Sequence, residues 1–400
     1  MTPDLTSQSF MANPFAACDR LRGEGPLVRV KLPIIGRVWI ATTQAALAAV
    51  LKDTENFSMR RANGKVAGMQ WWMPRSVGLL ANNMLTFDDP DHKRLRQLVD
   101  RAFRRDAITA LEPRIEARAA ELARSLFDNR DEADLVTAYA RQLPLAVICD
   151  LLGVSDTVKE RFAAQAGRLT SVNSVLGFVR AFASLGRFTR LVEAEIERVR
   201  RSAGTGLIAE LVAMQQAGEP ISDDEMIAMV FLLLVAGHET TTHVISGGIY
   251  ELLRDPARRQ WLMADESRMA LAVEEILRFI SAVQFSKPRI ARRDLEVEGT
   301  RVARGEMVMA MIAAANSDPA AIECPHRFDM ERRANRHVAF GAGPHFCLGH
   351  QLARIEIACA IRALFATWPQ LRLAVAQDDI RWRSRVGLRA IERLPATIIR

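Results

Sequence analysis

The decisive stretch of this sequence is FGAGPHFCLG, residues 340–349. It places Cys347 between glycines, directly before a predicted helix over Leu348–Trp368 that ends at Pro369. A thiolate there is stabilised by free backbone N–H groups and the helix dipole. Because the glycines leave little side-chain bulk, a flat iron macrocycle could lie on such a loop. The alternative interpretation is a small hydrophobic residue at a helix start.

The cysteines as a set support a single reactive thiol. The five lie at positions 18, 149, 324, 347 and 359, with no CxxC pair. An odd number without paired spacing is typical neither of a disulfide framework nor of a structural zinc site. The pattern predicts a reducing, cytoplasmic location.

The composition is that of an ordinary globular protein. The 400 residues are 49% hydrophobic and 25% charged, with a net charge of +7, which excludes disorder and fibrous repeats. No linker divides the chain, so we expect one domain over residues 1–400. The basic residues are mostly arginines interleaved with acids, which argues against a nucleic-acid partner.

No membrane segment is expected. The first 19 residues contain no apolar core of a signal or anchor. The most apolar window, Met226–Gly237, covers about 12 residues, whereas a membrane span needs about 20.

Most of the chain has helical periodicity. Residues 106–128 and 178–201 are typical of amphipathic helices. The strongest helix begins at Ser222, where Ser222 and Glu225 form a capping box, and it stops at Asp255-Pro256. At about 33 residues, and apolar nearly all round in its middle third, it must cross the interior. Its polar residues therefore need a reason.

Strand signals are short and few. They cover Leu27–Val30, Val38–Ile40, Leu295–Val302 with a Glu298-Gly299 turn, and Met307–Ile312. The sequence therefore predicts a mainly α fold with a small β subdomain.

The whole loop at 340–349 resembles the haem-binding loop of the cytochrome P-450 superfamily, F-G-x-G-x-H/R-x-C-x-G. The resemblance implies the cytochrome P-450 fold of a soluble bacterial member, with the long central helix over the haem. It also implies that Cys347 is the axial thiolate and metal ligand. His345 would bind a haem propionate and Phe340 would lie against the ring, with Gly349 completing the cofactor-binding loop.

The segment Ala236-Gly237-His238-Glu239-Thr240 of the long helix is similar to the A/G-G-x-D/E-T segment of the same family. Ala236 and Gly237 would then lie against the cofactor. Glu239 and Thr240 would relay protons to oxygen as catalytic residues. The alternative for a mid-helix threonine is packing against its own helix. His238 is expected to face away.

Two more motifs follow the family order. Glu275 and Arg278 form E-x-x-R, implied to be a buried structural pair joined by a further arginine, either Arg333 or Arg336. Taken alone, such a pair is weak evidence, since surface pairs at this spacing are plentiful. The propionate contacts implied by resemblance are His92 and Arg96, which share a helix face, and Arg289.

The resemblance implies a haem-thiolate monooxygenase that uses haem b and O₂ to hydroxylate or epoxidise an apolar small molecule of terpenoid, steroid, fatty acyl or polyketide type. Electrons would come from NAD(P)H through a ferredoxin or flavodoxin and its reductase, and we expect a monomer. The expected pocket residues are Trp71, Trp72, Leu79, Leu80, Val283, Phe285 and Leu388. The alternatives are a peroxide-driven haem-thiolate enzyme, a haem sensor or carrier without turnover, and a helical scaffold without haem.

Overall fold

The computed structural model describes residues 3–32, 35–61, 82–128, 130–155, 157–161, 175–202, 204–384 and 387–398, with the single residues 64, 66 and 78. The side chains of residues 175–185 lie outside this description. The chain forms two compact units. Unit 1 holds residues 1–67, 108–143 and 240–400, and unit 2 holds residues 68–107 and 144–239. The single domain expected over residues 1–400 remains a prediction.

Unit 1 contains a five-stranded sheet in the order β1-β2-β8-β5-β3. Its strands are β1 (Leu27–Leu32), β2 (Gly36–Ala41), β3 (Phe57–Ser58), β5 (Arg289–Ala291) and β8 (Met307–Ala310). Strands β1 and β2 form an antiparallel pair, and β2 runs parallel to β8. The predicted strand over Met307–Ile312 ends earlier, because Ile312 begins the short helix α15 (Ile312–Ala315).

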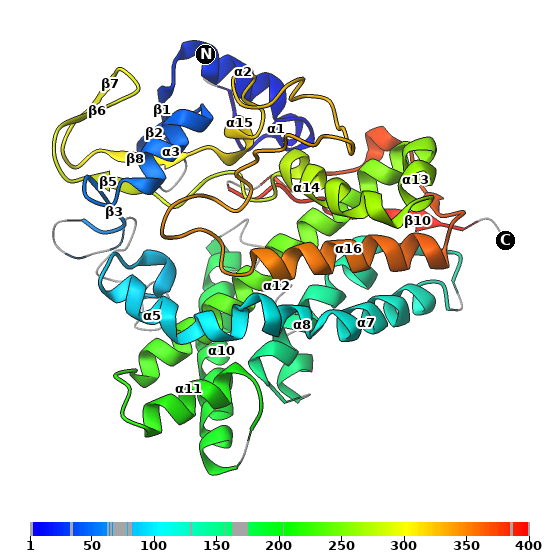
Figure 1. The fold of residues 1–400 in the computed structure, drawn as a ribbon, viewed down its shortest axis with the longest axis horizontal. Helices are drawn as coiled ribbons and strands as arrows, with labels where there is room; N and C mark the ends of the chain where they lie inside the picture. The colour runs from blue at the N-terminus through cyan, green and yellow to red at the C-terminus, as the bar shows by residue number, and fades with distance from the viewer. Residues whose placement is uncertain are drawn as a thin grey trace. The chain divides into compact units, whose positions relative to one another are not determined.

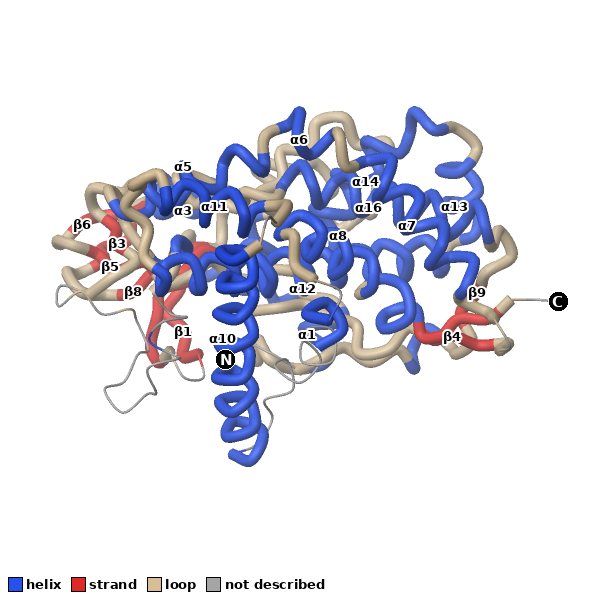
Figure 2. Tube along the Cα trace, turned by 90° about the horizontal axis from the view of Figure 1, so that it is seen from below, coloured by secondary structure: helices blue, strands red, loops and turns tan. Residues whose placement is uncertain are grey.

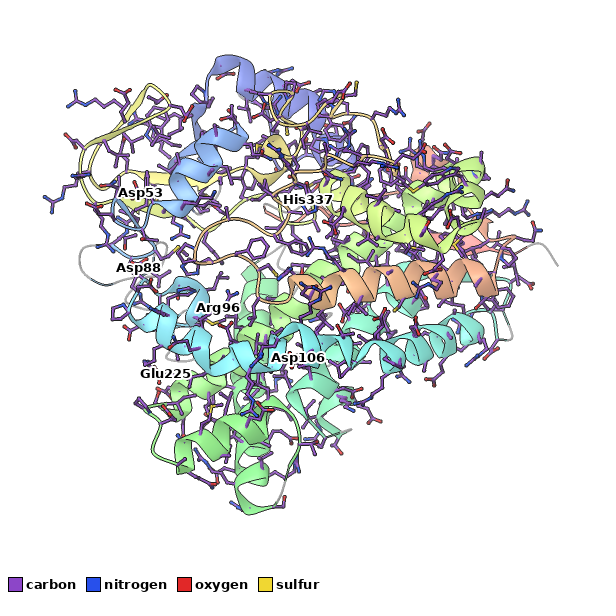
Figure 3. All side chains as sticks on the ribbon, viewed as in Figure 1. Asp53, Asp88, Arg96, Asp106, Glu225 and His337 are labelled. Atoms are coloured by element: carbon purple, nitrogen blue, oxygen red, sulfur yellow. The ribbon has the colours of Figure 1, made fainter. Side chains whose placement is uncertain are left out.

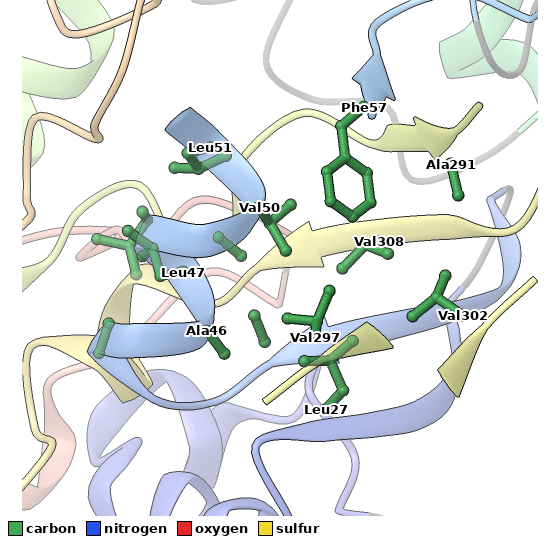
Figure 4. Close-up of a cluster of buried hydrophobic side chains, with 14 residues drawn as sticks. Leu27, Ala46, Leu47, Val50, Leu51, Phe57, Ala291, Val297, Val302 and Val308 are labelled. Carbon is green, nitrogen blue, oxygen red and sulfur yellow. The ribbon is translucent and has the colours of Figure 1, made fainter. Parts of the chain in front are cut away.

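Helix α3 (Gln44–Lys52) covers this sheet with apolar side chains (Figure 4). Leu47, Val50 and Leu51 are buried with Val308 of β8 and Phe57 of β3 in one hydrophobic cluster. Burying each such side chain contributes about 1.5–3 kcal/mol. The sheet and α3 therefore share one hydrophobic core.

The described residues also form two smaller sheets. The strands β6 (Leu295–Val297) and β7 (Thr300–Val302) form a hairpin around Glu298 and Gly299, which have φ values of 48° and 77°. This is the turn that the sequence predicted, since two positive φ values suit a tight hairpin. The other sheet has the order β4-β10-β9, with β4 (Glu132–Asp134), β9 (Arg372–Leu373) and β10 (Pro395–Thr397).

The long helix α16 (His350–Thr367), orange in Figure 1, lies among other helices of unit 1. Helix α16 packs along α7 (Glu112–Ser125), and Trp368 donates to the Ala123 carbonyl over 2.7 Å. The other helices of this unit are α1 (Gln8–Ala12), α2 (Phe15–Glu24), α13 (Pro256–Met263) and α14 (Met269–Ile280). The sequence predicted α16 to within two residues at each end.

Unit 2 is helical. It contains α5 (Asp91–Asp100), α10 (Val175–Arg201) and α11 (Leu207–Gln216), while α6 (Arg105–Thr109) and α8 (Gln142–Leu152) cross its boundaries (Figure 2). The predicted helix over residues 106–128 divides into α6 and α7. Pro113 at the start of α7 has no N–H to donate, so the chain turns there instead of continuing one helix.

Helix α12 (Asp223–Arg254) is the long helix expected from the sequence. Its capping box forms as predicted: Glu225 accepts from the Ser222 N–H over 2.9 Å, and Ser222 Oγ accepts from the Glu225 N–H over 3.2 Å. Among the described residues, α12 is the helix that is long enough and apolar enough to cross a membrane. However, 61% of its most apolar window is buried inside the protein. That burial fits a core helix.

Candidate active site

The Cys347 loop has a fixed backbone geometry in unit 1. The Cys347 N–H donates to the Phe340 carbonyl over 3.0 Å, and the Phe346 N–H donates to the Gly343 carbonyl over 3.0 Å. Gly343 has a φ of +73°, and a Cβ built there would lie 2.3 Å from the Leu51 carbonyl oxygen. Only glycine fits this position, because a side chain would clash with the backbone of α3.

Cys347 also differs from the other cysteines in its environment. Burial raises the pKa of Cys18, Cys149 and Cys359 to about 12, so these thiols are protonated at neutral pH. Cys324 is exposed, away from any helix start. Cys347 is half-buried, three residues before α16 begins. Of the five cysteines, Cys347 is therefore the one whose partial burial and position near a helix start suit a thiolate ligand.

The other predicted cofactor contacts of unit 1 lie in the same loop or on β5. Phe340 and His345 are half-buried in the loop, and Gly349 is the N-cap residue of α16. Arg289 begins β5 and is 4% exposed. A buried guanidinium is suited to hold a carboxylate.

The two predicted contacts of unit 2 lie on α5, where Figure 3 labels Arg96. His92 is buried, with Nδ1 3.2 Å from Asp89 Oδ1, and Arg96 donates from Nε to Asp100 Oδ1 over 3.2 Å. Spacing of four residues places both on one face of the helix. The expected convergence of these two residues with Arg289 and His345 remains a prediction.

The middle of α12 has one face that is not buried. Ala236 is exposed, and Leu232 and Thr240, each four residues away, are half-buried, as is Glu239. Residues 241–250, by contrast, are all buried. An exposed alanine in the centre of a core helix is unusual, because such positions are normally packed. The face that carries Glu239 and Thr240 is thus open to a bound molecule.

Two neighbours on α12 have structural contacts. A Cβ at Gly237 would lie 3.2 Å from the Ile148 side chain of α8, so the glycine makes room for helix packing within unit 2. This contact gives Gly237 a role that does not depend on the cofactor. His238 is buried, and its Nδ1 lies 2.6 Å from the Leu234 carbonyl oxygen, consistent with the structural role expected for it.

Glu275 and Arg278 form a buried ion pair in α14. Both side chains are 0% exposed, and Arg278 Nη2 lies 2.7 Å from Glu275 Oε1. The third member is Arg332, whose Nε donates to Glu275 Oε2 over 3.2 Å. The prediction that Arg333 or Arg336 would join the pair is therefore wrong: both are exposed, because the loop turns them outward.

Three of the predicted pocket residues lie on extended segments that pair with one another. Val283 is bridged to Leu388, and Phe285 to Met311. Phe285 and Leu388 are buried, and Val283 is half-buried. The other four, Trp71, Trp72, Leu79 and Leu80, lie outside the described residues.

A buried carboxyl group that the motifs in the sequence did not indicate lies behind α12. Glu356 of α16 is 2% exposed, and the Thr241 hydroxyl is its hydrogen-bond partner. Burial raises the pKa of Glu356 well above its usual value, although the bond with Thr241 lowers it. The helical pattern contained a signal for it, since Leu352, Glu356 and Ala360 share the buried face of α16.

Glu274, which directly precedes the E-x-x-R motif, is a second residue that the motifs did not indicate. Its carboxylate contacts His337 and Arg354, and Arg354 lies seven residues after Cys347. No local spacing links these three residues, so the sequence held no signal for the cluster.

A family model, curated relatives and solved structures that resemble this chain all point to the same family. The cytochrome P450 family model matches residues 183–368. The chain is 37% identical to the vitamin D(3) 25-hydroxylase of Pseudonocardia autotrophica, covering 99% of this chain and 96% of that protein. It is 34% identical to the 6-deoxyerythronolide B hydroxylase of Saccharopolyspora erythraea, covering 99% and 98%. The crystal structure of myxobacterial cytochrome P450 CYP267B1 in complex with myristic acid aligns with a TM-score of 0.93 at 35% identity, covering 100% of both chains.

Proposed function

Because this chain belongs to the cytochrome P450 family and is a haem-thiolate monooxygenase, we propose that it oxidises a medium-sized apolar molecule of terpenoid, steroid, fatty acyl or polyketide type. The names of its relatives support this class: one acts on vitamin D(3), another on 6-deoxyerythronolide B, and a third binds myristic acid. The apolar side chains of Val283, Phe285 and Leu388 fit such a molecule.

The residues present fit a haem b group. The donor set offers one half-buried cysteine at a helix start, a loop kept thin by glycine at Gly343, and an open face on α12. Bound haem supplies an iron centre that binds O₂ and takes up electrons for the oxidation. Cys347 would hold the iron through its thiolate, with Phe340 and Gly349 shaping the loop around it.

Basic residues would hold the two propionates. Arg289 and His345 of unit 1 would each donate to a propionate oxygen, and His92 and Arg96 of unit 2 would do the same from one face of α5. Charge-assisted bonds from arginine are the strong means of holding a partly buried carboxylate.

Glu239 and Thr240 would handle protons. The Thr240 hydroxyl can accept a proton from Glu239, directly or through water, and donate one toward the open face of α12. A peroxide-driven enzyme or a haem carrier gains nothing from this pair. Their presence therefore favours the monooxygenase that consumes O₂ and external electrons.

Family membership implies that electrons come from redox partner proteins. We propose a ferredoxin or flavodoxin, reduced by NAD(P)H through its reductase, and a monomeric enzyme in the cytoplasm. The five free cysteines fit a reducing compartment.

Turnover in labelled oxygen tests the proposal. The purified haem-loaded protein, a ferredoxin, its reductase and NADPH are incubated under ¹⁸O₂ with vitamin D(3) and, separately, myristic acid. We expect an oxygenated product that carries one labelled atom, detected by mass spectrometry. A product with unlabelled oxygen would contradict the use of O₂. No oxygenated product from either compound would contradict the steroid and fatty acyl members of the proposed substrate class.

A further inference from the structure

Glu274 on α14 joins two distant parts of unit 1. Arg354 of α16 donates to it as a fork, from Nε to Oε1 over 2.5 Å and from Nη2 to Oε2 over 2.9 Å. His337, labelled in Figure 3, lies in the segment before the Cys347 loop, with Nε2 2.9 Å from Glu274 Oε2. A bidentate guanidinium contact fixes both the distance and the plane of its partner.

The hydrogen bond to Nδ1 of His337 shows which of its two ring nitrogens carries the proton. Its Nδ1 accepts the backbone N–H of Ala339 over 3.2 Å, so Nε2 carries the proton and donates to Glu274. Burial raises the pKa of Glu274, but hydrogen bonds from His337 and Arg354 outweigh it and hold the pKa at about 2. Glu274 is therefore a carboxylate that balances the charge of Arg354.

The same guanidinium contacts the aromatic ring of the cysteine loop. The Arg354 carbon Cζ lies 4.6 Å from the centroid of the Phe340 ring, within the range of a cation–π contact. Arg354 Nη1 also donates to His350 Nδ1 over 2.9 Å, and the His350 ring lies 6.0 Å from that of Phe340. The His337 ring is at the same distance. Phe340 thus lies among Arg354, His337 and His350. Glu274 contacts the first two directly, and it contacts His350 through Arg354.

One hydrogen bond separates Phe340 from the predicted metal ligand. The Phe340 carbonyl accepts the Cys347 N–H over 3.0 Å. A displaced Phe340 would move this carbonyl, and with it the direction of the Cys347 backbone. Contacts to residues next to a metal ligand orient that ligand and change the redox potential of the metal.

We propose that Glu274, through Arg354 and His337, is a positioning residue that holds Phe340 and the Cys347 loop in the conformation in which the Cys347 thiolate would hold the iron. The inference rests on the proposed role of Cys347 and goes beyond it. The substitution Glu274→Gln keeps the size of the side chain but removes its charge. It leaves the Arg354 cation, which lies over the Phe340 ring, without its anion and weakens the fork. The additional positive charge favours the reduced iron centre.

The chain offers a matched control on the same helix. Arg362 of α16 pairs with Glu266, which is 66% exposed and has no contact with the loop among the described residues. The substitution Glu266→Gln removes one carboxylate from one arginine of α16, so the net charge changes equally in both variants. Any difference between them reflects the position of Glu274.

The experiment measures two properties of the haem-loaded variants. The first is the midpoint reduction potential. The second is the rate at which the absorption band of the reduced carbon monoxide complex moves from near about 450 nm to near about 420 nm. We expect Glu274→Gln to convert about tenfold faster than the parent protein, which corresponds to the loss of one charge-assisted contact. Its potential should shift positive. Glu266→Gln should match the parent protein in both.

Two results would overturn the positioning role. One is equal behaviour of Glu274→Gln and Glu266→Gln. The other is a lower melting temperature of Glu274→Gln with an unchanged potential and an unchanged band, which would indicate a role in stability alone. A parent protein without a band near about 450 nm would instead refute the proposed role of Cys347.

Discussion

The Arg278 guanidinium and the Glu275 carboxylate lie 2.7 Å apart with both side chains wholly removed from solvent. Arg278 also donates to the backbone carbonyls of Asn316, Pro325 and Arg327, while Glu275 accepts from Arg332 and from the Asp329 N–H. The pair therefore fixes the path of the chain over residues 316–332, which leads into the Cys347 loop.

The substitution Glu275→Gln should destabilise the folded protein strongly. It leaves the Arg278 cation buried without its anion, a change that costs about 3–5 kcal/mol. The free energy of unfolding in urea measures the effect. The control is Glu121→Gln, which breaks an exposed pair with Arg118 and should cost less than about 1 kcal/mol. Equal stability of the two variants would contradict this account of the pair.

Glu274 should make the protein sensitive to acid. Its folded pKa of about 2 lies below its ordinary value of 4.5, so the folded state binds its proton less readily than the unfolded state. The resulting stability is present above about pH 4.5 and is lost as the pH falls toward about 2. In Glu274→Gln the slope of unfolding free energy against pH should be smaller in this window. An unchanged slope would show that Glu274 is not paired in solution.

Glu356 should have the opposite dependence. Burial raises its folded pKa, so the folded state binds this proton more tightly than the unfolded state does, and stability falls as the pH rises above about 4.5. Glu356→Gln removes this proton uptake and should be at least as stable as the parent protein at pH 7. Glu356→Ala should lose about 2–4 kcal/mol because it leaves a cavity against α12. Unfolding in urea at pH 7 compares them; a Gln variant as unstable as the Ala variant would show that Glu356 is ionised.

Thr240 provides a test of proton delivery. We expect Thr240→Ala to bind haem and substrate as before but to divert electrons from NADPH into hydrogen peroxide, since the hydroxyl no longer donates a proton. The ratio of oxygenated product to NADPH consumed measures this coupling. Thr242→Ala removes another hydroxyl of the same helix, buried two residues further on, and should couple normally. Normal coupling in Thr240→Ala would contradict the relay.

Features with local spacing were predictable from the sequence. The capping box of Ser222 and Glu225, the turn at Glu298-Gly299 and the pair Glu275–Arg278 each depend on residues within four positions, so helix or turn geometry places them. Helix boundaries followed from proline and from capping residues for the same reason.

Features that depend on the path of loops were not predictable. Arg332, rather than Arg333 or Arg336, completes the buried pair because the loop after Asp329 turns that side chain inward. Likewise, Gly237 makes room for Ile148, which is 89 positions earlier in the chain. No periodic pattern in the sequence predicts a contact between residues so far apart. The cluster of Glu274, His337 and Arg354 joins three segments and needs the three-dimensional structure.

The most direct test of the account is the absorption spectrum of the reduced, carbon monoxide-bound protein, compared with that of Cys347→Ala. We expect a band near about 450 nm in the parent protein and its complete loss in the variant, because on the proposed site the Cys347 thiolate would hold the iron. A parent band near about 420 nm alone, or a band near about 450 nm that survives in Cys347→Ala, would contradict the assignment of Cys347 and with it the proposed site.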